Sequence, residues 1–232
     1  MAIKPKDFYD QLIENGIDFF TGVPDSLLKE ICLCIDDRTP AKNHIITANE
    51  GNAIALASGY FLAQQSIPLV YMQNSGFGNA INPLLSLCDI DVYSIPMLMI
   101  IGWRGEPGMK DEPQHITQGR IQIEMMESMD LPYEIINGNT PDYSTKLSKL
   151  IDIANKENRP VALLIKKGTF GKHDSKNTKS QKVHMKREDA LSIILDKVSE
   201  DSIIVSTTGK TSREIFEIRK NRGQAHKKDF LT

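Results

Sequence analysis

Short apolar runs alternate with longer stretches of helical periodicity along most of the chain, and this alternation constrains the fold more than any other feature. Residues 44–48 form an apolar run suited to a buried parallel strand, and residues 49–64 then place apolar side chains at helical spacing. Asn49 can cap that helix at its start. Strands separated by helices of this length pair in parallel through right-handed crossovers. The sequence therefore predicts an α/β fold, a doubly wound and mostly parallel sheet with helices on both faces.

The predicted sheet domain contains strands and helices in regular succession. We expect strands at 17–20, 44–48, 69–72, 97–101, 133–136 and 161–165, and helices at 5–16, 26–35, 49–64, 81–87, 117–127 and 143–156. No apolar run approaches the roughly 20 residues that cross a bilayer, and the N-terminus lacks an apolar signal core.

The composition shifts near Lys167, where residues 168–182 become polar and are typical of an interdomain linker. A second α/β unit follows, with an expected helix at 187–198, a strand at 203–206 and a helix at 212–219. One strand and two helices cannot enclose a core. We therefore predict a domain at 1–167, a linker at 168–184 and a short, incomplete α/β segment at 185–232.

Charge and cysteine content narrow the class of protein. The chain has 232 residues, 28 Lys and Arg against 30 Asp and Glu, and a net charge of −2, which gives no argument for nucleic acid or an acidic membrane as partner. Cys32, Cys34 and Cys88 are odd in number and show no C-x-x-C spacing. We expect reduced, buried cysteines in a cytoplasmic protein, with neither a disulfide nor a zinc site.

Polar residues follow the predicted strands at the edge where open α/β sheets bind ligands. Glu50 lies in the first turn of a helix after a strand, where a carboxylate can serve a ligand or only complement the helix dipole. The turn at 73–79 holds a G-x-G, which permits close approach of a ligand or forms only a tight turn. Ile81 replaces the third glycine of the dinucleotide fingerprint, and no G-K-[ST] follows for a phosphate-binding P-loop.

The segment 102–119 is a long loop with several prolines and glycines after a predicted strand end. Loops of this length within compact domains are usually functional or disordered. Arg104, Lys110 and His115 lie in it and can together hold a small polyanion. The alternative is a solvated surface loop with scattered charges.

Four segments taken together carry a family resemblance. They are TGVPDSLL at 21–28, ANEGNAIALASGY at 48–60, QNSGFGNAINPL at 73–84 and WRGEPGMKDEPQH at 103–115. In this order they resemble the phosphonopyruvate decarboxylases, thiamin-diphosphate-dependent 2-oxo acid decarboxylases that are close kin to the sulfopyruvate decarboxylases. The resemblance implies that 1–167 is a pyrimidine-binding domain. STTGKTSREIFE at 206–217 resembles the opening of the family's diphosphate-binding domain.

The resemblance also implies a role for each candidate residue. Loss of carbon dioxide from a 2-oxo acid requires an electron sink that no side chain provides, and thiamin diphosphate with Mg²⁺ is the implied cofactor. Glu50 would protonate the aminopyrimidine ring and help to generate the ylide, in an apolar setting that raises its proton affinity. His115 would be the general acid/base and Asp25 a relay carboxylate, a place for which Ser26 competes. Arg104 and Lys110 would bind the phosphonate, and Gln73, Asn74 and Gly76 would line the cofactor pocket.

The implied reaction converts 3-phosphonopyruvate to phosphonoacetaldehyde and carbon dioxide in phosphonate (2-aminoethylphosphonate) biosynthesis. Sulfopyruvate is the alternative substrate, and a non-catalytic binding or regulatory module with a pyrimidine-domain fold is the alternative of another class. The family's magnesium motif, a G-D-G followed by an Asn-rich segment, does not occur in the sequence, so no metal ligand is expected in this chain.

The missing motif also shapes the expected state of the protein. We expect the chain to be a shortened form of a longer enzyme and to be inactive alone. The less favoured alternative is one subunit of an enzyme that is divided between two chains. In the family the active site lies between two chains, which implies a homo-oligomer. We expect a dimer in which the apolar helix at 53–62 takes part.

Overall fold

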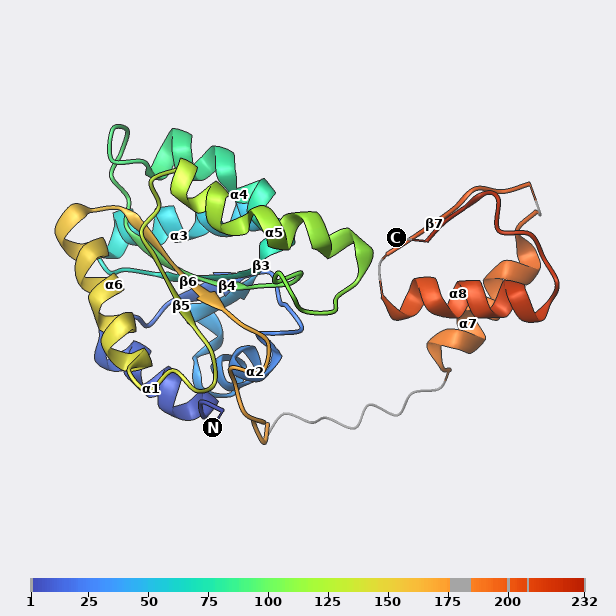
Figure 1. The fold of residues 1–232 in the computed structure, drawn as a ribbon, viewed down its shortest axis with the longest axis horizontal. Helices are drawn as coiled ribbons and strands as arrows, with labels where there is room; N and C mark the ends of the chain where they lie inside the picture. Colours follow the sequence, from blue (N-terminus) through green and yellow to red (C-terminus); the bar gives the residue numbers. More distant parts are fainter. Residues whose placement is uncertain (1, 176–184, 200, 208, 232) are drawn as a thin grey trace. The chain divides into compact units, whose positions relative to one another are not determined.

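The computed structural model describes residues 2–175, 185–199, 201–207 and 209–231. They fall into two compact units, unit 1 at Met1–Asn177 and unit 2 at Thr178–Thr232 (Figure 1). Within the described ranges, no helix is long and apolar enough to cross a membrane. All three cysteines are free, Cys34 and Cys88 being buried and Cys32 half-buried.

Unit 1 is built on a six-stranded sheet with the strand order β2-β1-β3-β4-β6-β5, in which all neighbouring strands are parallel. The strands are β1 (Phe20–Gly22), β2 (His44–Ile46), β3 (Leu69–Gln73), β4 (Met97–Gly102), β5 (Tyr133–Ile136) and β6 (Pro160–Ile165). Strands β3, β4 and β6 lie within one residue of the predicted ranges, because they are apolar runs buried on both faces. The edge strand β5 has the predicted bounds, and β2 ends two residues before its predicted end.

Helices cover both faces of this sheet (Figure 1). One face carries α1 (Pro5–Glu14), α2 (Lys29–Arg38) and α6 (Tyr143–Glu157), and the other carries α3 (Glu50–Gln64), α4 (Phe77–Pro83) with η3 (Leu84–Cys88), and α5 (Pro113–Ser128). The alternation of side chains along β4 separates the two cores. Leu98 and Ile100 pack against the first set of helices, and Met97, Met99 and Ile101 against the second. The predicted doubly wound α/β fold is confirmed.

The strand order creates a switch point between β1 and β3. The chain leaves β1 to form β2 on one side, whereas β3 continues to β4 on the other. In open α/β sheets, ligands bind in the crevice outside the carboxyl ends of the strands at such a point. Gly22 ends β1 and Gln73 ends β3 there. The segments that follow these two strands therefore hold the candidate site.

Several elements differ from the sequence-based expectation. Strand β1 lies at Phe20–Gly22 and not at 17–20, α2 begins at Lys29 and not at residue 26, and α4 begins at Phe77 and not at residue 81. Strand β2, expected to be buried, is the edge strand, with Ile45 38% and Ile46 59% exposed. Helix α5 begins at Pro113, four residues before the expected start, because proline is favoured at the first helical position, where its missing N–H costs nothing. His115 therefore lies in the first turn of α5 and not in a loop.

The start of the expected linker packs on unit 1. Phe170 contacts Phe8 with ring centroids 5.1 Å apart, and its backbone pairs with Ile3. The His173 backbone N–H donates to Glu30 (2.7 Å), and its ring lies 2.9 Å from Asp37. Residues 168–175 are thus attached to unit 1, and the expected linker residues 176–184 lie outside the described residues.

Unit 2 contains α7 (Arg187–Lys197), β7 (Ile204–Ser206), α8 (Lys210–Asn221) and β8 (Asp229–Leu231). Strands β7 and β8 pair in parallel, with Val205 opposite Phe230. The sequence analysis missed β8, a strand of three residues that begins with a charged side chain. That side chain, Asp229, is buried in an ion pair with Arg219 at 2.7 Å.

Candidate functional site

Glu50 is the first residue of α3, directly after the N-cap Asn49, whose side chain accepts a hydrogen bond from the Asn52 N–H at 3.0 Å. This capping fixes the first turn of the helix beyond the end of β2. The Glu50 side chain is turned inward and only 8% exposed. A carboxylate so placed is positioned by the backbone and shielded from solvent.

Gly76 and Asn79 enclose the Glu50 carboxylate. The Asn79 amide donates to Glu50 Oε2 at 2.8 Å. A Cβ added at Gly76 would lie 2.0 Å from Glu50 Oε1, so the glycine provides the space that this oxygen occupies. The apolar setting expected for Glu50 is present only in part, since Ile54 and Met72 are buried whereas Ile46 and Ala48 are exposed.

Asp25 follows β1 and is buried against the end of β4. Its Oδ2 accepts a hydrogen bond from the Leu27 N–H at 2.9 Å and lies 2.2 Å from where a Cβ would stand at Gly102. Its Oδ1 is buried without a hydrogen-bond partner. Burial raises the pKa of this carboxyl above its ordinary value. An unpaired buried oxygen in the switch-point crevice marks a group that is available to a ligand.

We expect Asp25→Asn to stabilise the protein by about 1 kcal/mol at pH 7, because a buried, incompletely paired carboxylate is removed. The folded carboxyl has the raised pKa, so wild-type stability falls as the pH rises from the unfolded pKa through the folded one. The gain should therefore vanish at acid pH, where both states of Asp25 are protonated. Thermal unfolding of both proteins across this pH range measures it, and a pH-independent difference would contradict the stated cause.

The loop after β4 is organised by Asp111. Its carboxylate forms a two-pronged ion pair with Arg104, with Nε to Oδ2 at 2.8 Å and Nη2 to Oδ1, and accepts the Gly105 N–H at 2.8 Å. The Nδ1 atom of His115 lies 3.0 Å from Asp111 Oδ1. The Arg104 guanidinium, together with these hydrogen bonds, holds the pKa of the Asp111 carboxyl well below its usual range. Asp111 is therefore a permanent anion.

Arg104 joins three strand ends. Its Nη1 donates to Ser26 Oγ after β1 at 3.0 Å. Asn74, after β3, is bonded through both halves of its amide to the Arg104 backbone, donating to its C=O at 2.8 Å and accepting its N–H at 3.0 Å. Gln73 Nε2 lies 3.4 Å from His115 Nε2. The structure thus brings the expected residues Asp25, Ser26, Gln73, Asn74, Arg104 and His115 to one edge of the sheet.

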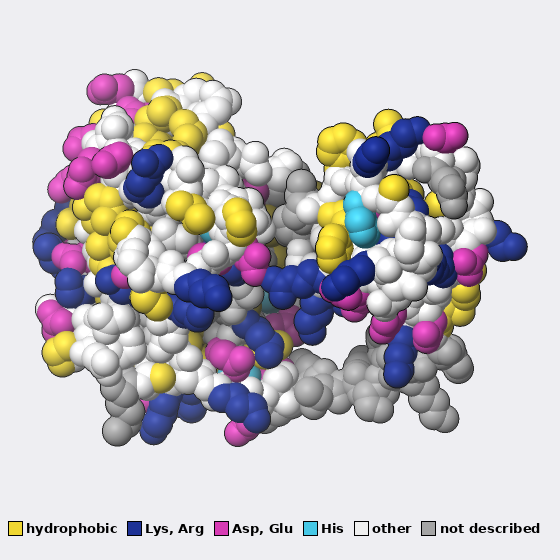
Figure 2. Space-filling view, turned by 45° about the vertical axis from the view of Figure 1, so that its right-hand side comes forward, with side chains coloured by type: hydrophobic (Ala, Val, Ile, Leu, Met, Phe, Trp, Pro, Cys, Tyr) yellow, Lys and Arg dark blue, Asp and Glu magenta, His cyan; other side chains and the backbone are white. Residues whose placement is uncertain are grey.

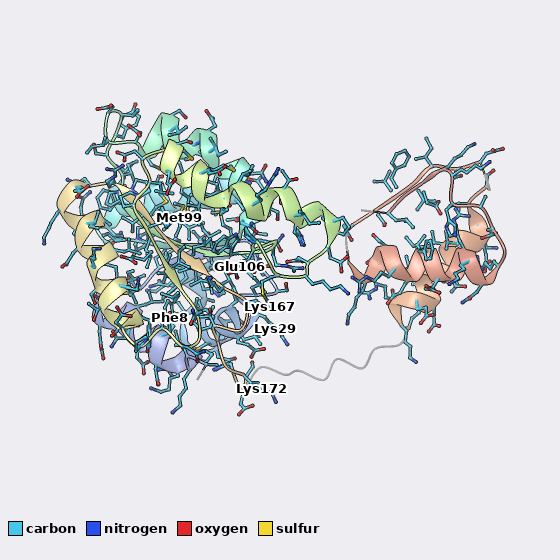
Figure 3. All side chains as sticks on the ribbon, in the orientation of Figure 1. Phe8, Lys29, Met99, Glu106, Lys167 and Lys172 are labelled. Atoms are coloured by element: carbon cyan, nitrogen blue, oxygen red, sulfur yellow. The ribbon has the colours of Figure 1, made fainter. Side chains whose placement is uncertain are left out.

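A cavity of about 540 Å³ opens beside this network and is lined by Ser26, Leu27, Arg104, Lys110, Asp111, Glu112, Pro113 and Lys167. Lys110 was expected here, whereas Lys167, two residues after the end of β6, was not. Figure 3 labels Lys29, Glu106 and Lys167 on the same side of unit 1. Figure 2 shows basic side chains beside acidic ones on the visible face of unit 1, as the near-balanced charge predicts.

Sequence reasoning missed three residues of the site. Asp111 carried a signal in its spacing, four residues before His115, which places the two side chains together at the start of a helix. Asn79 and Lys167 contact or line the site through the fold, and no local pattern distinguished them.

The residues present fit one half of the implied cofactor. Glu50 offers a shielded carboxylate beside a glycine that leaves room at its Oε1, which suits a ring nitrogen that shares a proton. Among the residues that the structure describes, no group of three or more His, Cys, Asp or Glu could hold a metal ion. The described residues of unit 1 thus offer a carboxylate that fits the pyrimidine ring, and no acidic cluster that fits a magnesium ion. Fold and site define a class: a parallel α/β domain whose switch-point crevice carries a shielded carboxylate.

Comparison with known proteins specifies the class further. The family described as thiamine pyrophosphate enzyme, N-terminal TPP binding domain, matches residues 6–127, more than half of the chain. The chain therefore belongs to the thiamine pyrophosphate enzymes, and its relatives are 2-oxo acid decarboxylases. The resemblance inferred from the four sequence segments is confirmed at this level.

Curated relatives fall into two groups. Phosphonopyruvate decarboxylase from Streptomyces viridochromogenes is 32% identical over 220 residues, 88% of this chain and 54% of the relative. The phosphonopyruvate decarboxylase of Streptomyces hygroscopicus is 30% identical, and the match covers 93% of this chain and 57% of the relative. The alpha subunit of sulfopyruvate decarboxylase from Methanococcus maripaludis is 34% identical over 72% of this chain and 95% of the subunit. The chain spans about half the length of the two phosphonopyruvate decarboxylases.

Solved structures agree on the fold. Benzoylformate decarboxylase from Polynucleobacter necessarius aligns with a TM-score of 0.58 at 15% identity, covering 92% of this chain and 40% of that one. Thiamine diphosphate-dependent 4-hydroxybenzoylformate decarboxylase from Rhodococcus jostii aligns with a TM-score of 0.51 at 18% identity. This alignment covers 90% of this chain and 40% of that one. At these identities the likeness shows the fold alone.

Proposed function

We propose that this chain forms the pyrimidine-side half of an active site that decarboxylates 3-phosphonopyruvate to phosphonoacetaldehyde and carbon dioxide, in phosphonate biosynthesis. The observation that carries the proposal is the cavity of about 540 Å³ with Arg104, Lys110 and Lys167 in its wall. The substrate bears a phosphonate with close to two negative charges and one carboxylate, and such a group calls for several cationic donors.

Each residue of the chain has a proposed task. Thiamin diphosphate, when bound, supplies the electron sink that loss of carbon dioxide requires. Glu50 shares a proton with the pyrimidine ring from its shielded position. As the C1–C2 bond breaks, carbon dioxide leaves and a proton takes its place on C2. His115 delivers that proton, and Asp25 with its unpaired Oδ1 faces the reacting carbons.

The remaining groups bind and orient. Arg104 and Lys110 would hold the phosphonate, with Ser26 beside Arg104. Gln73, Asn74 and Gly76 would border the cofactor, Gly76 by leaving space next to Glu50. Mg²⁺ and the diphosphate would be bound by groups outside the described residues, since none of these forms an acidic cluster.

Sulfopyruvate is the second candidate substrate, because the alpha subunit of sulfopyruvate decarboxylase matches over 95% of its own length. We favour phosphonopyruvate as the substrate, because the two phosphonopyruvate decarboxylases match 88% and 93% of this chain. Matches of that extent reach beyond unit 1, at Met1–Asn177, into unit 2. Offering both acids in competition to the assembled enzyme and measuring carbon dioxide release decides between them. Release from neither acid would instead support a non-catalytic binding module.

We also propose that the assembled enzyme is a homo-oligomer with its active site between chains. Exposed apolar side chains lie on α3, on η3 and in the loop between η3 and β4, and they favour a protein contact. They are Leu62 (60% exposed), Leu85 (43%), Ile90 (48%), Val92 (46%) and Tyr93 (69%). Unpaired, such residues would leave an apolar surface in water.

Lys167→Met tests the cationic cavity. Since the lysine lines the cavity but is exposed, we expect the KM for phosphonopyruvate to rise about three- to tenfold with little change in kcat. The KM for pyruvate, which lacks the phosphonate, should stay the same. Lys172→Met is the matched control, because Lys172 is 84% exposed and does not line the cavity. Equal effects on both substrates would remove Lys167 from phosphonate binding.

A further inference from the structure

Asp111 accepts hydrogen bonds from five donors at the candidate site. Oδ1 accepts from Arg104 Nη2, His115 Nδ1 (3.0 Å) and the Glu112 N–H (2.8 Å). Oδ2 accepts from Arg104 Nε and the Gly105 N–H, both at 2.8 Å. The Asp111 side chain is 14% exposed, so little of its hydrogen-bonding capacity is left for solvent. One carboxylate thus joins the residue proposed to bind the anion to the residue proposed to move the proton.

We propose that Asp111 is a positioning residue that fixes the tautomer of His115 and the direction of the Arg104 guanidinium at the same time. The proposal rests on the proposed function, which assigns proton transfer to His115 and anion binding to Arg104. It adds that the two tasks are coupled through one side chain. Asp111 itself touches neither the reacting carbon nor the proton that is delivered.

The hydrogen bonds of His115 specify one tautomer. An ionised Asp111 can only accept, so Nδ1 must carry a hydrogen. On the other side, the Gln73 amide nitrogen faces Nε2 at 3.4 Å and also donates to Ser75 Oγ. An amide nitrogen can only donate, so Nε2 must be the acceptor. The neutral Nδ1–H tautomer satisfies both neighbours and leaves the Nε2 lone pair on the side of the strand ends.

One charged network and several neutral groups surround the His115 ring. Asp111 faces Nδ1, and Arg104 is the counter-ion of that carboxylate. Gln73 from β3 is neutral, and η2 (Asn74–Gly76), which packs against α5, has no titratable side chain. Protonation at Nε2 would place two donors face to face, so the Gln73 amide must turn as His115 takes up its proton. Asp111 stabilises the resulting imidazolium, as the aspartate of a catalytic triad does.

The same carboxylate orients Arg104. Its planar guanidinium group donates two hydrogen bonds to Asp111, and its backbone C=O accepts one from the Asn74 amide. Within the described part of the chain, three of the five guanidinium N–H groups are used, by Asp111 and Ser26. One N–H on each terminal nitrogen is left for an anion. Without Asp111 the long side chain would lose this fixed direction.

The direct test is the protonation state of the His115 ring, measured by ¹⁵N NMR on the chain labelled at histidine, with His115→Gln to assign the signal. In the wild-type protein near neutral pH we expect the neutral Nδ1–H tautomer. A dominant Nε2–H tautomer would overturn the proposal whether or not the protein decarboxylates any substrate. The NMR measurement requires neither the cofactor nor catalytic activity, so its outcome is independent of the proposed function.

Asp111→Asn then separates positioning from folding. Removing the anion should raise the population of the Nε2–H tautomer of His115, because an asparagine side chain no longer requires a donor at Nδ1. In the assembled enzyme, kcat should fall as well as KM rise, because both His115 and Arg104 are released. Asp152→Asn, which neutralises an exposed aspartate on α6, is the matched control. An unchanged His115 tautomer together with an unchanged kcat in Asp111→Asn would refute the coupling.

Discussion

Glu50→Gln is expected to lower kcat of the assembled enzyme by about 10²- to 10⁴-fold, the range associated with loss of a general acid/base. Glutamine has the same shape as glutamate and can still accept the Asn79 hydrogen bond that now ends on Oε2. What it cannot do is exchange a proton with a ring nitrogen. The fold should therefore be intact, and thermal unfolding should show a melting temperature close to that of the wild type.

The control for this variant is Glu124→Gln, which neutralises an exposed carboxylate on α5. It should leave both kcat and the melting temperature unchanged. Calorimetric titration with thiamin diphosphate adds a measurement besides activity, and we expect weaker binding in Glu50→Gln only. Near-normal turnover in that variant would remove Glu50 from the chemistry, even though it lies in the right crevice.

Gly76→Ala is expected to reduce kcat/KM by about 100-fold without unfolding the protein. The added methyl carbon would lie 2.0 Å from Glu50 Oε1 and 2.2 Å from its Cδ, so the carboxyl group must move aside. The atoms that the methyl group would meet belong to the end of a flexible side chain. The substitution should therefore displace the Glu50 carboxyl group without destabilising the fold. A displacement of about 1 Å in a catalytic group is enough for a loss of this size.

Gly78→Ala provides a close control two residues away. No atom lies within 4 Å of a Cβ built at Gly78, which is inside α4. Alanine there should leave activity unchanged and stabilise the helix by about 0.5–1 kcal/mol. Measuring kcat/KM and thermal unfolding for both variants separates the two effects. Equal activities would mean that the Gly76 contact does not position Glu50.

The periodic parts of the chain could be predicted, and the edges could not. Strand β4 (Met97–Gly102) lies within one residue of its predicted bounds, because a buried parallel strand has a continuous apolar signal. Strand β2 carries the same kind of signal, yet it pairs with β1 alone and leaves Ile46 exposed. Strand order decides this, and a local pattern contains no information on strand order.

The site shows the same division. The position of Glu50 in the first turn of a helix after a strand could be predicted locally, whereas its proposed role came from the resemblance carried by the four segments. Asp111 and Lys167 come from two loops that meet only because β4 and β6 are neighbours in the sheet. The bridging role of Asp111 becomes visible only when Arg104 and His115 are placed around it.

The groups proposed to bind substrate, Ser26, Arg104, Lys110 and Lys167, all follow strands and none lies within one. Both apolar layers are complete without them. The scaffold and the recognition surface can therefore evolve separately, since exchanging a few loop residues would redirect the same sheet to another acid.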